Sequence, residues 1–364
     1  MTIEGIPKEM KAVQVVEFHK PYKIHQVPTP TQLKDHEILL KTVVASLCHT
    51  DSMVTAGKFP TKLPCTASHE GTGIVKAVGS KVTNFKVGDR VMSGLPKGPC
   101  GSCVNCQKND WRQYCENIEG HIGVFVDGAF AEYHVVDSRS SCHIPDNVSF
   151  TSAAPLACAG CTIYRAIIVS EVKKGDWLAI VGAGGGLGHL GIQFARAKGI
   201  NIVAIDARDE GLELCKKAGA EHIFDAREGN EIVVKKIQDL TDGLGVHAAI
   251  NVSEHETSAD LACEVTRMHG YMIQVAQPDR VSIAFQQLIF RDIQVKGTLI
   301  AGQEYSQQML HDVGKHNIKV ETNLFYGLEE VPRMVELSHS GKMKGKAVCV
   351  VDNDELKKEK VSSS

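Results

Sequence analysis

The chain has 364 residues, of which 43% are hydrophobic and 23% charged, with a formal net charge of −3, 33 glycines and 12 cysteines. These values are typical of a globular protein of about two domains, and they exclude a disordered chain, a collagen-like chain and a coiled coil. The small net charge provides no bulk attraction to nucleic acid or to an anionic membrane, so neither is expected as a partner.

The first part of the chain, to about residue 155, has the pattern of an all-β region. Short segments rich in Val, Ile and Thr are separated by Gly, Pro and Asp turns; they lie at 12–18, 37–45 and 73–78. Segments of this length and composition predict strands, and no helical period of useful length interrupts them. We therefore expect this part to form short strands joined by loops.

From Trp177 the chain alternates apolar strands with helical segments. The predicted strands are 178–181, 202–205, 222–224, 248–251 and 271–275, and the predicted helices are 189–198, 212–218, 231–240 and 259–267. This alternation predicts parallel βαβ units in a doubly wound α/β domain, which ends near Gly297. The tail returns to mixed character, with a helix predicted at 329–338 and a final strand at 347–351.

A glycine-rich turn joins the first of these strands to the first helix. The candidate phosphate-binding residues are Gly182, Gly185, Gly186, Leu187 and Gly188. Glycines there allow a tight turn, and they let backbone N–H groups approach a pyrophosphate at the helix N-terminus. The spacing is one residue longer than G-x-G-x-x-G, but the strand and helix around it are those of a dinucleotide-binding turn.

An acidic residue, Asp206, lies 18 positions after Gly188, at the end of the next predicted strand. A carboxylate about 20 residues beyond the turn binds the hydroxyls of the adenosine ribose and repels a 2′-phosphate, so we predict NAD as the cofactor. Arg208 follows closely and leaves residual use of NADP open.

Four cysteines lie within one short lobe, residues 96–116. Cys100, Cys103, Cys106 and Cys115 have the spacing C-x2-C-x2-C-x8-C. Four thiolates can close a tetrahedral zinc site that has no open position, which is a structural site. An iron–sulfur cluster is the alternative, but its compact bacterial motif has a last gap of three residues followed by Pro. The spacing therefore favours structural zinc.

A second candidate metal set comes from three separate segments. Cys48 follows an apolar segment, His69 comes about twenty residues later, and Cys158 lies just before the α/β domain. A lone Cys or His is usually a packing residue, but two Cys and one His make a catalytic zinc set that leaves one position open. An open zinc polarises an alcohol or carbonyl oxygen.

Several motifs together resemble one enzyme family over essentially the whole chain. They are CHTD at 48–51, SHEGTG at 68–73, VGDRV at 87–91, the four-Cys lobe, CAGCTIY at 158–164 and GAGGGLG at 182–188. In this combination the chain resembles the zinc-dependent medium-chain alcohol dehydrogenases, and within them the tetrameric branch of yeast and bacteria. The resemblance implies a GroES-like catalytic domain (1–157 and 298–364) around an inserted Rossmann domain (158–297).

The resemblance also implies roles at the reaction centre for residues around the zinc ligands. Glu70 would lie behind the zinc as an occasional ligand, and Asp51 would accept the second N–H of His69. Thr50 would hydrogen-bond the substrate oxygen and pass its proton toward the nicotinamide ribose. His49 would face the cofactor pyrophosphate. The implied reaction is hydride transfer between an alcohol carbon and NAD, with two zinc ions per subunit.

Further cofactor and substrate positions follow from the same resemblance. Thr162, Val252 and Val275 correspond to nicotinamide contacts and Lys346 to a basic residue near the pyrophosphate, with ordinary packing or a solvated charge as the alternative. Cys161 flanks the site. Phe59 and Leu95 stand where relatives that use ethanol commonly carry Trp, and these smaller side chains predict substrates bulkier than ethanol.

Other functions stay open at this stage. They are a reductase of one biosynthetic pathway, a polyol or formaldehyde-type dehydrogenase, and a non-catalytic NAD(H) sensor. The four-Cys lobe disfavours the polyol enzymes, and the complete zinc sets disfavour the sensor. The resemblance implies a homotetramer, with a homodimer as the alternative. We expect a cytoplasmic protein, because no secretory pattern is visible and clustered thiols point to a reducing compartment.

Overall fold

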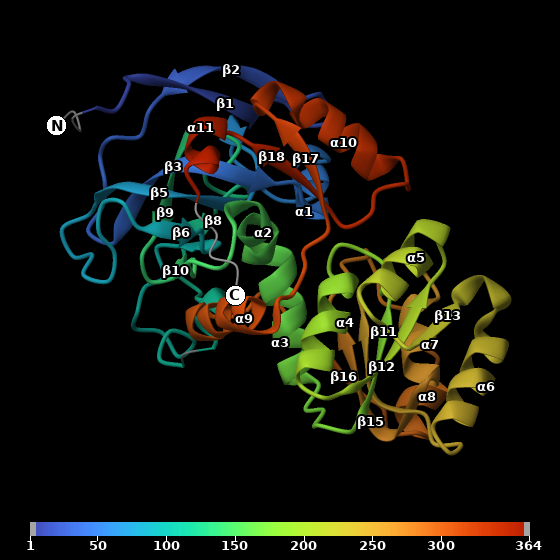
Figure 1. The fold of residues 1–364 in the computed structure, drawn as a ribbon. Helices are drawn as coiled ribbons and strands as arrows, with labels where there is room; N and C mark the ends of the chain where they lie inside the picture. The colour runs from blue at the N-terminus through green and yellow to red at the C-terminus, as the bar shows by residue number, and fades with distance from the viewer. Residues whose placement is uncertain (1–4, 109, 360–364) are drawn as a thin grey trace. The chain divides into compact units, whose positions relative to one another are not determined.

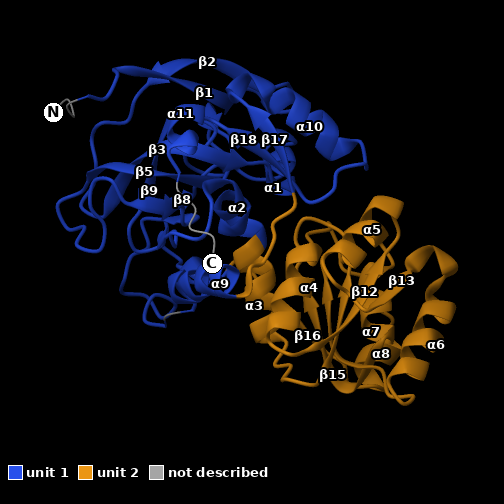
Figure 2. Cartoon of the chain, viewed as in Figure 1, with its two compact units in different colours: residues 1–159, 301–315, 322–364 blue, residues 160–300, 316–321 orange. Residues whose placement is uncertain are grey.

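The computed structural model describes residues 5–108 and 110–359, and it divides into two compact units (Figures 1 and 2). Unit 1 consists of residues 1–159, 301–315 and 322–364, and unit 2 of residues 160–300 and 316–321. The change between units therefore falls at 159/160 and 300/301, within three residues of the predicted positions. Two features differ from the prediction: Cys158 belongs to unit 1, and the short segment 316–321 returns to unit 2.

Unit 2 is built on a six-stranded parallel sheet (Figure 1). Its strands are β11 (Trp177–Val181), β12 (Asn201–Asp206), β13 (His222–Asp225), β14 (Val246–Asn251), β15 (Thr266–Gln274) and β16 (Gln294–Gly297). They lie in the order β13-β12-β11-β14-β15-β16, and every neighbouring pair is parallel. This is the doubly wound order 3-2-1-4-5-6, as predicted, and its winding reverses between β11 and β14.

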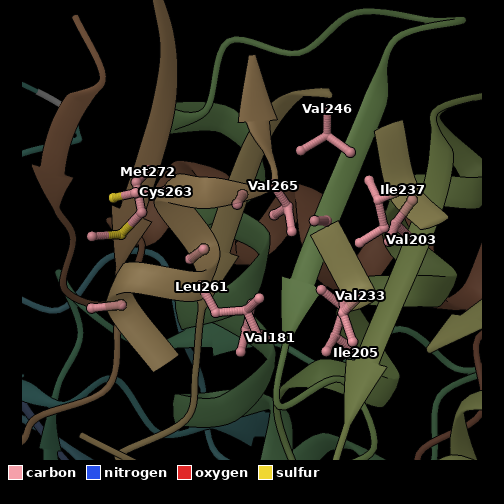
Figure 3. Packing of buried hydrophobic residues seen from close by; sticks show 14 of the residues in the cluster. Val181, Val203, Ile205, Val233, Ile237, Val246, Leu261, Cys263, Val265 and Met272 are labelled. Atoms are coloured by element: carbon pink, nitrogen blue, oxygen red, sulfur yellow. The ribbon is translucent and has the colours of Figure 1, made fainter. Parts of the chain in front are cut away.

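Helices join these strands and cover the sheet. They are α3 (Cys161–Val169), α4 (Gly188–Ala197), α5 (Asp209–Lys217), α6 (Asn230–Leu240), α7 (Ser258–Glu264) and α8 (Phe285–Ile289), with the 3₁₀ turn η3 (Ala226–Glu228). Apolar side chains from strands and helices, such as Val181, Val233 and Leu261, pack into one buried cluster (Figure 3). The predicted helix 259–267 is too long, because Thr266 already pairs with Val246 as the first residue of β15.

Unit 1 contains the strands predicted in the first part of the chain and in the tail. One sheet joins β1 (Glu9–Val15), β2 (Lys23–Pro28) and β4 (Cys65–Thr66), and β7 (Pro96–Lys97) pairs with β8 (Gly120–His121). The largest sheet joins β3 (Glu37–Ser46), β5 (Glu70–Val78), β6 (Arg90–Met92), β9 (Tyr133–Asp137), β10 (Cys142–His143), β17 (Thr322–Tyr326) and β18 (Lys346–Val350). Since β18 pairs with β3, the tail completes a sheet begun by the first part.

Short helices interrupt the strands of unit 1, and among these helices the sequence analysis predicted only the one at 329–338 in the tail. They are α1 (His49–Thr55) and α2 (Phe150–Pro155), followed by the π-helical turn η2 (Leu156–Gly160); the tail adds α9 (Gln303–His316), α10 (Val331–His339) and α11 (Asn353–Lys357), with 3₁₀ turns η1 (Arg112–Tyr114) and η4 (Leu328–Glu330). The seven residues of α1 span only about two turns, too few for an apolar period to stand out in a sequence.

Residues 150–169 are helical throughout. By length and composition they make the one helix in the described part of the chain that could cross a membrane, and 78% of the tested window is buried inside the protein. Ser, Thr and Arg residues interrupt its apolar run. Its burial is that of a core helix.

Candidate functional site

The four cysteines of the lobe come together, as their spacing predicts. Their sulfur atoms all lie within 4.8 Å of one another. Two of the separations, Cys100 Sγ to Cys106 Sγ and Cys103 Sγ to Cys115 Sγ, are both 3.9 Å. A tetrahedron with metal–sulfur bonds of about 2.3 Å has edges of about 3.8 Å. The four sulfurs therefore fit a single zinc ion with no coordination position left open.

The backbone of the lobe favours thiolate at one of these ligands. The amide of Cys103 donates a hydrogen bond to Cys100 Sγ at 3.3 Å. The amides of Ser102 and Cys103 lower the pKa of Cys100 to about 5. The thiolate that a metal requires is thus the favoured form of this side chain.

The second cluster joins Cys48, His69, Glu70 and Cys158, whose ligand atoms also lie within 4.8 Å of one another. Cys48 precedes the first residue of α1, Glu70 begins β5 and Cys158 lies in the π-helical turn η2. Both ring nitrogens of His69 and the Oε2 atom of Glu70 are buried without a hydrogen-bond partner. Orphaned buried donors and acceptors are rare. Two sulfurs, a free imidazole and a carboxylate together fit a zinc ion.

Charge around the cluster favours a thiolate. The pKa of Cys48 is held well below its usual value by its hydrogen bond with Cys158, and further by the charges of Lys346 and His69, in spite of burial. Burial disfavours the imidazolium of His69, but the neighbouring Cys48 thiolate raises the pKa of His69 to about 9. The set is therefore arranged to stabilise thiolate by positive charge, which a metal cation would also supply.

Lys346 forms a buried ion pair with Glu70. Its Nζ lies 2.8 Å from Glu70 Oε1, and the two side chains are 5% and 0% exposed. Although burial disfavours the ammonium, Glu70 and Cys48 raise the pKa of Lys346. The sequence analysis expected Lys346 near a cofactor pyrophosphate; the ammonium lies against Glu70, and its contact with a pyrophosphate stays a prediction.

The role expected for Asp51, accepting a hydrogen bond from the ring of His69, needs correction. Its carboxylate accepts hydrogen bonds from the backbone amides of Cys48 and Ser68, each at 2.8 Å, and not from the ring of His69. Asp51 is 1% exposed. Its two carboxylate oxygens link the backbone segment that bears Cys48 to the one that bears His69. It therefore positions the ligand-bearing backbone rather than the His69 ring.

Ser68, directly before His69, has a left-handed backbone with φ of +68°. A non-glycine residue in this region is strained by about 1–2 kcal/mol. The Ser68 hydroxyl donates to Ser46 O at 2.8 Å and accepts from the Glu70 amide at 3.3 Å. These bonds, which Gly could not make, offset the strain and fix the direction in which His69 leaves the turn.

Two glycines let the backbone of Ser68 lie deep in unit 1. A Cβ at Gly123 would come within 2.4 Å of Ser68 C and O, and one at Gly128 within 2.0 Å of Ser68 O. Gly123 also has φ of +69°. The sequence analysis missed both residues, since nothing in their local sequence pointed to His69.

The residues predicted around the substrate lie on α1 and on nearby loops. Thr50 Oγ1 is 3.7 Å from Cys48 Sγ, and His49 is exposed as the first residue of α1. Phe59 packs edge-on against Phe125, with ring centroids 6.1 Å apart. Leu95 is buried. The structure thus brings Thr50 to the metal ligands, whereas shared contact of Phe59 and Leu95 with a substrate stays a prediction.

In unit 2 the glycine-rich turn follows β11 and leads into α4. Gly182 has φ of +87°, which glycine tolerates best. A Cβ at Gly188 would come within 2.5 Å of Ala183 Cα, whereas one at Gly185 would meet only Gly182 O, at 3.3 Å. The turn is thus closely packed where it meets α4 but open above Gly185. This open backbone fits the phosphate-binding role expected for the half-buried residues 185–187.

Asp206 is the last residue of β12, and its side chain forms a hydrogen bond with the glycine-rich turn. Its Oδ2 accepts from the Gly184 amide at 2.8 Å, and its Oδ1 accepts from the amides of Ala207 and Arg208 at 2.9 and 3.0 Å. A Cβ at Gly211 would lie 2.2 Å from Asp206 Oδ1, so this close approach requires glycine. The sequence analysis predicted a ribose contact for Asp206 but not this structural one.

The remaining predicted cofactor residues lie at or near the carboxyl ends of the strands in unit 2. Val252 follows β14 and donates its amide to Val181 O at 3.0 Å; Val275 follows β15 and donates to Asn251 O at 3.0 Å. Ligands of open α/β sheets bind at this edge. Thr162, on α3, is 8% exposed, and Cys161 beside it is buried. Their contacts with a nicotinamide stay predictions.

Two family matches cover most of the chain. Residues 34–146 match the family described as "Alcohol dehydrogenase GroES-like domain", and residues 186–315 match "Zinc-binding dehydrogenase". The first match lies in unit 1 and supports the GroES-like fold expected there. The second covers most of the parallel-sheet unit and all but the last residue of α9.

Relatives match over nearly their full length. An alcohol dehydrogenase of Geobacillus stearothermophilus is 35% identical over 95% of this chain and all of its own, and alcohol dehydrogenase 1 of Emericella nidulans is 32% identical over 90% and 94%. The crystal structure of an alcohol dehydrogenase from Aeropyrum pernix, 28% identical, superimposes with a TM-score of 0.85 over 93% of this chain and 99% of its own.

Proposed function

Because the chain belongs to the zinc-binding alcohol dehydrogenase family, we propose that each subunit holds two zinc ions and acts on alcohols and carbonyl compounds bulkier than ethanol. The family establishes the reaction class, NAD-dependent interconversion of alcohols with aldehydes or ketones. The observation that carries the zinc proposal is the buried set Cys48, His69, Glu70 and Cys158, in which His69 has no partner for either ring nitrogen.

The two metal sites would differ in purpose. The lobe supplies four sulfurs and would hold a structural ion, whereas Cys48, His69 and Cys158 supply three ligands and leave room for a substrate oxygen. A zinc ion in the second site would polarise that oxygen. Glu70, already paired with Lys346, would stay behind the ion as an occasional ligand.

Residues of this chain would bind and orient the reactants. Thr50, whose hydroxyl lies beside Cys48, is placed to accept the hydroxyl proton of an alcohol and pass it on. His49 is exposed and would contact the cofactor pyrophosphate. The turn after β11 would hold the same pyrophosphate with backbone amides, and the nicotinamide would supply the hydride acceptor.

The cofactor preference that we propose is NAD over NADP. Asp206 carries its charge at the end of β12, where a 2′-phosphate would have to approach, and its side chain is 5% exposed. The Arg208 Nε lies 3.6 Å from Asp206 Oδ1 and balances part of that charge, so residual NADP use is expected.

We further propose a cytoplasmic homo-oligomer, a tetramer or a dimer. Strand β16 pairs only with β15 among the described residues, so its other edge is available to a second copy. The preceding helix α8 and its end expose Phe285, Ile289 and Phe290 at 60%, 70% and 69%. An apolar patch beside an open edge supports self-association, and six reduced ligand thiols support a reducing compartment.

The substrate proposal is tested by measuring NADH formation at 340 nm with ethanol, hexanol and benzyl alcohol. Because Phe59 and Leu95 are smaller than Trp, we expect kcat/KM for hexanol or benzyl alcohol to exceed that for ethanol. A kcat/KM for ethanol well above the other two would contradict the proposal. Light scattering of the purified protein tests the oligomeric state.

A further inference from the structure

A concave site lies in unit 1, between the turn that joins β1 to β2, helix α1 and helix α10. This pocket has a volume of about 530 Å³. Tyr22, Pro332 and Val335 provide apolar surface, and Ala56 closes the end of α1. Pockets of this size and character are those in which proteins bind small molecules.

The pocket is on a different face of α1 from the reaction centre. Ser52, Thr55 and Ala56 line it, and their spacing of three and four residues places them on one side of the helix. Thr50, which approaches Cys48, lies on another side. None of the proposed zinc, cofactor or substrate residues lines this pocket. It is therefore a separate site.

The lining has a consistent electrostatic character. Lys20 brings an ammonium group, His19 and His339 bring imidazoles, and no lining residue is Asp or Glu. The imidazole of His339 is 3.1 Å from the Ser52 hydroxyl. A lining that combines positive and apolar side chains is complementary to a molecule with one negative group on an apolar body.

The walls of the pocket are held in place by hydrogen bonds. His19 donates its amide to Thr55 O at 2.7 Å, which ties the β1–β2 turn to α1. The Tyr22 hydroxyl donates to Asp51 O at 3.3 Å, and the Thr55 hydroxyl donates to the same oxygen at 3.0 Å. A preformed pocket binds with little ordering cost.

We propose that this pocket binds a small carboxylic acid with an aromatic or branched apolar body, whose carboxylate meets Lys20 while the body fills the space against Val335 and Pro332. The occupant would contact the helix that bears Thr50 without entering the reaction centre. The proposal does not depend on the reaction that the enzyme catalyses.

The test is calorimetric titration of the zinc-loaded enzyme with 2-naphthoate, with neutral 2-naphthamide as the matched ligand. We expect 2-naphthoate to bind at one site per chain and at least tenfold more tightly than the amide. Lys20→Met should weaken 2-naphthoate binding about tenfold, since a hydrogen bond to a charged group contributes about that factor. Ala56→Trp, which fills the pocket, should abolish it.

Controls separate this site from the reaction centre. Lys86→Met, at an exposed lysine outside the pocket, should leave the affinity unchanged, and all three variants should keep the alcohol kcat/KM of the unmodified enzyme. Unchanged affinity in both Lys20→Met and Ala56→Trp would overturn the proposal. So would displacement of 2-naphthoate by an alcohol substrate, which would place it at the catalytic metal.

Discussion

The ammonium of Lys346 lies 2.8 Å from Glu70 Oε1, although 276 positions separate the two residues in the chain. The topology explains the contact, because β3 runs between β5, which Glu70 begins, and β18, which Lys346 begins. Burial raises the pKa of Glu70 to about 7, although Lys346 favours the ionised carboxylate. Each group is therefore the main compensation for the buried charge of the other.

Removing one member of this pair should destabilise unit 1 more than removing both. Lys346→Met leaves a buried carboxylate without its cation and should lower the free energy of unfolding by about 3 kcal/mol. The double variant Lys346→Met with Glu70→Gln should recover part of that loss. Urea unfolding of the unmodified protein, Lys346→Met, Glu70→Gln and the double variant measures the coupling, and additive effects would show that the pair contributes no interaction of its own.

A buried neutral histidine should make the protein sensitive to acid. His134 lies between the Thr42 and Ser93 hydroxyls, at 2.8 and 2.7 Å, and burial lowers the pKa of His134 to about 3. The unfolded chain binds a proton at this residue below about pH 6.5, whereas the folded chain does not. Stability should therefore fall as the pH drops below 6.5, by about 2 kcal/mol at pH 5 from this residue.

The variant His134→Gln tests that effect, since it keeps hydrogen-bonding capacity without a titrating group. Urea midpoints at pH 8 and pH 5 should differ less in the variant than in the unmodified protein. Acid-driven loss of metal affects both proteins alike, so the difference between them isolates His134. Equal pH dependence in the two proteins would contradict the assignment.

The lobe cysteines should hold one zinc ion independently of the other site. Cys103→Ala should reduce the zinc content from two ions to one per chain and lower the thermal unfolding temperature, because the lobe has little apolar core of its own. The remaining ion should still support turnover at low temperature. Loss of both ions, or none, on mass-spectrometric metal analysis would contradict separate sites.

Asp206 should set the choice between NAD and NADP. Asp206→Asn removes the charge that repels a 2′-phosphate but keeps an oxygen that can accept from the Gly184 amide. The ratio of kcat/KM with NADP to that with NAD should rise at least tenfold. Arg208→Ala should move the ratio in the opposite direction. An unchanged ratio in Asp206→Asn would show that this carboxylate only holds the turn.

Much of the fold could be predicted from local patterns. The strands of unit 2 are short apolar runs with helices between them, and all five that were predicted are found, along with β16 at the sheet edge. The lobe was equally accessible, because its four cysteines lie close in sequence and their spacing alone brings the sulfurs together. Helix α1 was missed because about two turns carry no usable period.

The contacts that depend on distant segments could not be read from the sequence. The pairing of Lys346 with Glu70 requires the tail to return beside β3, and no local pattern encodes that neighbour. Ser68 is visible in the sequence directly before His69, but its positive φ and its bond to Ser46 appear only in three dimensions. The hydrogen bonds that Asp51 accepts from two backbone amides likewise depend on the fold and could not be read from the motif.

The most direct test of the proposed chemistry is the NAD-dependent oxidation of benzyl alcohol by the unmodified enzyme and by His69→Ala, followed at 340 nm. His69 contributes the only imidazole to the cluster of ligand atoms and has no other partner among the described residues. We predict that His69→Ala loses at least a thousandfold in kcat/KM while NADH binding, measured by fluorescence, is retained. Near-normal turnover by His69→Ala would contradict the zinc mechanism.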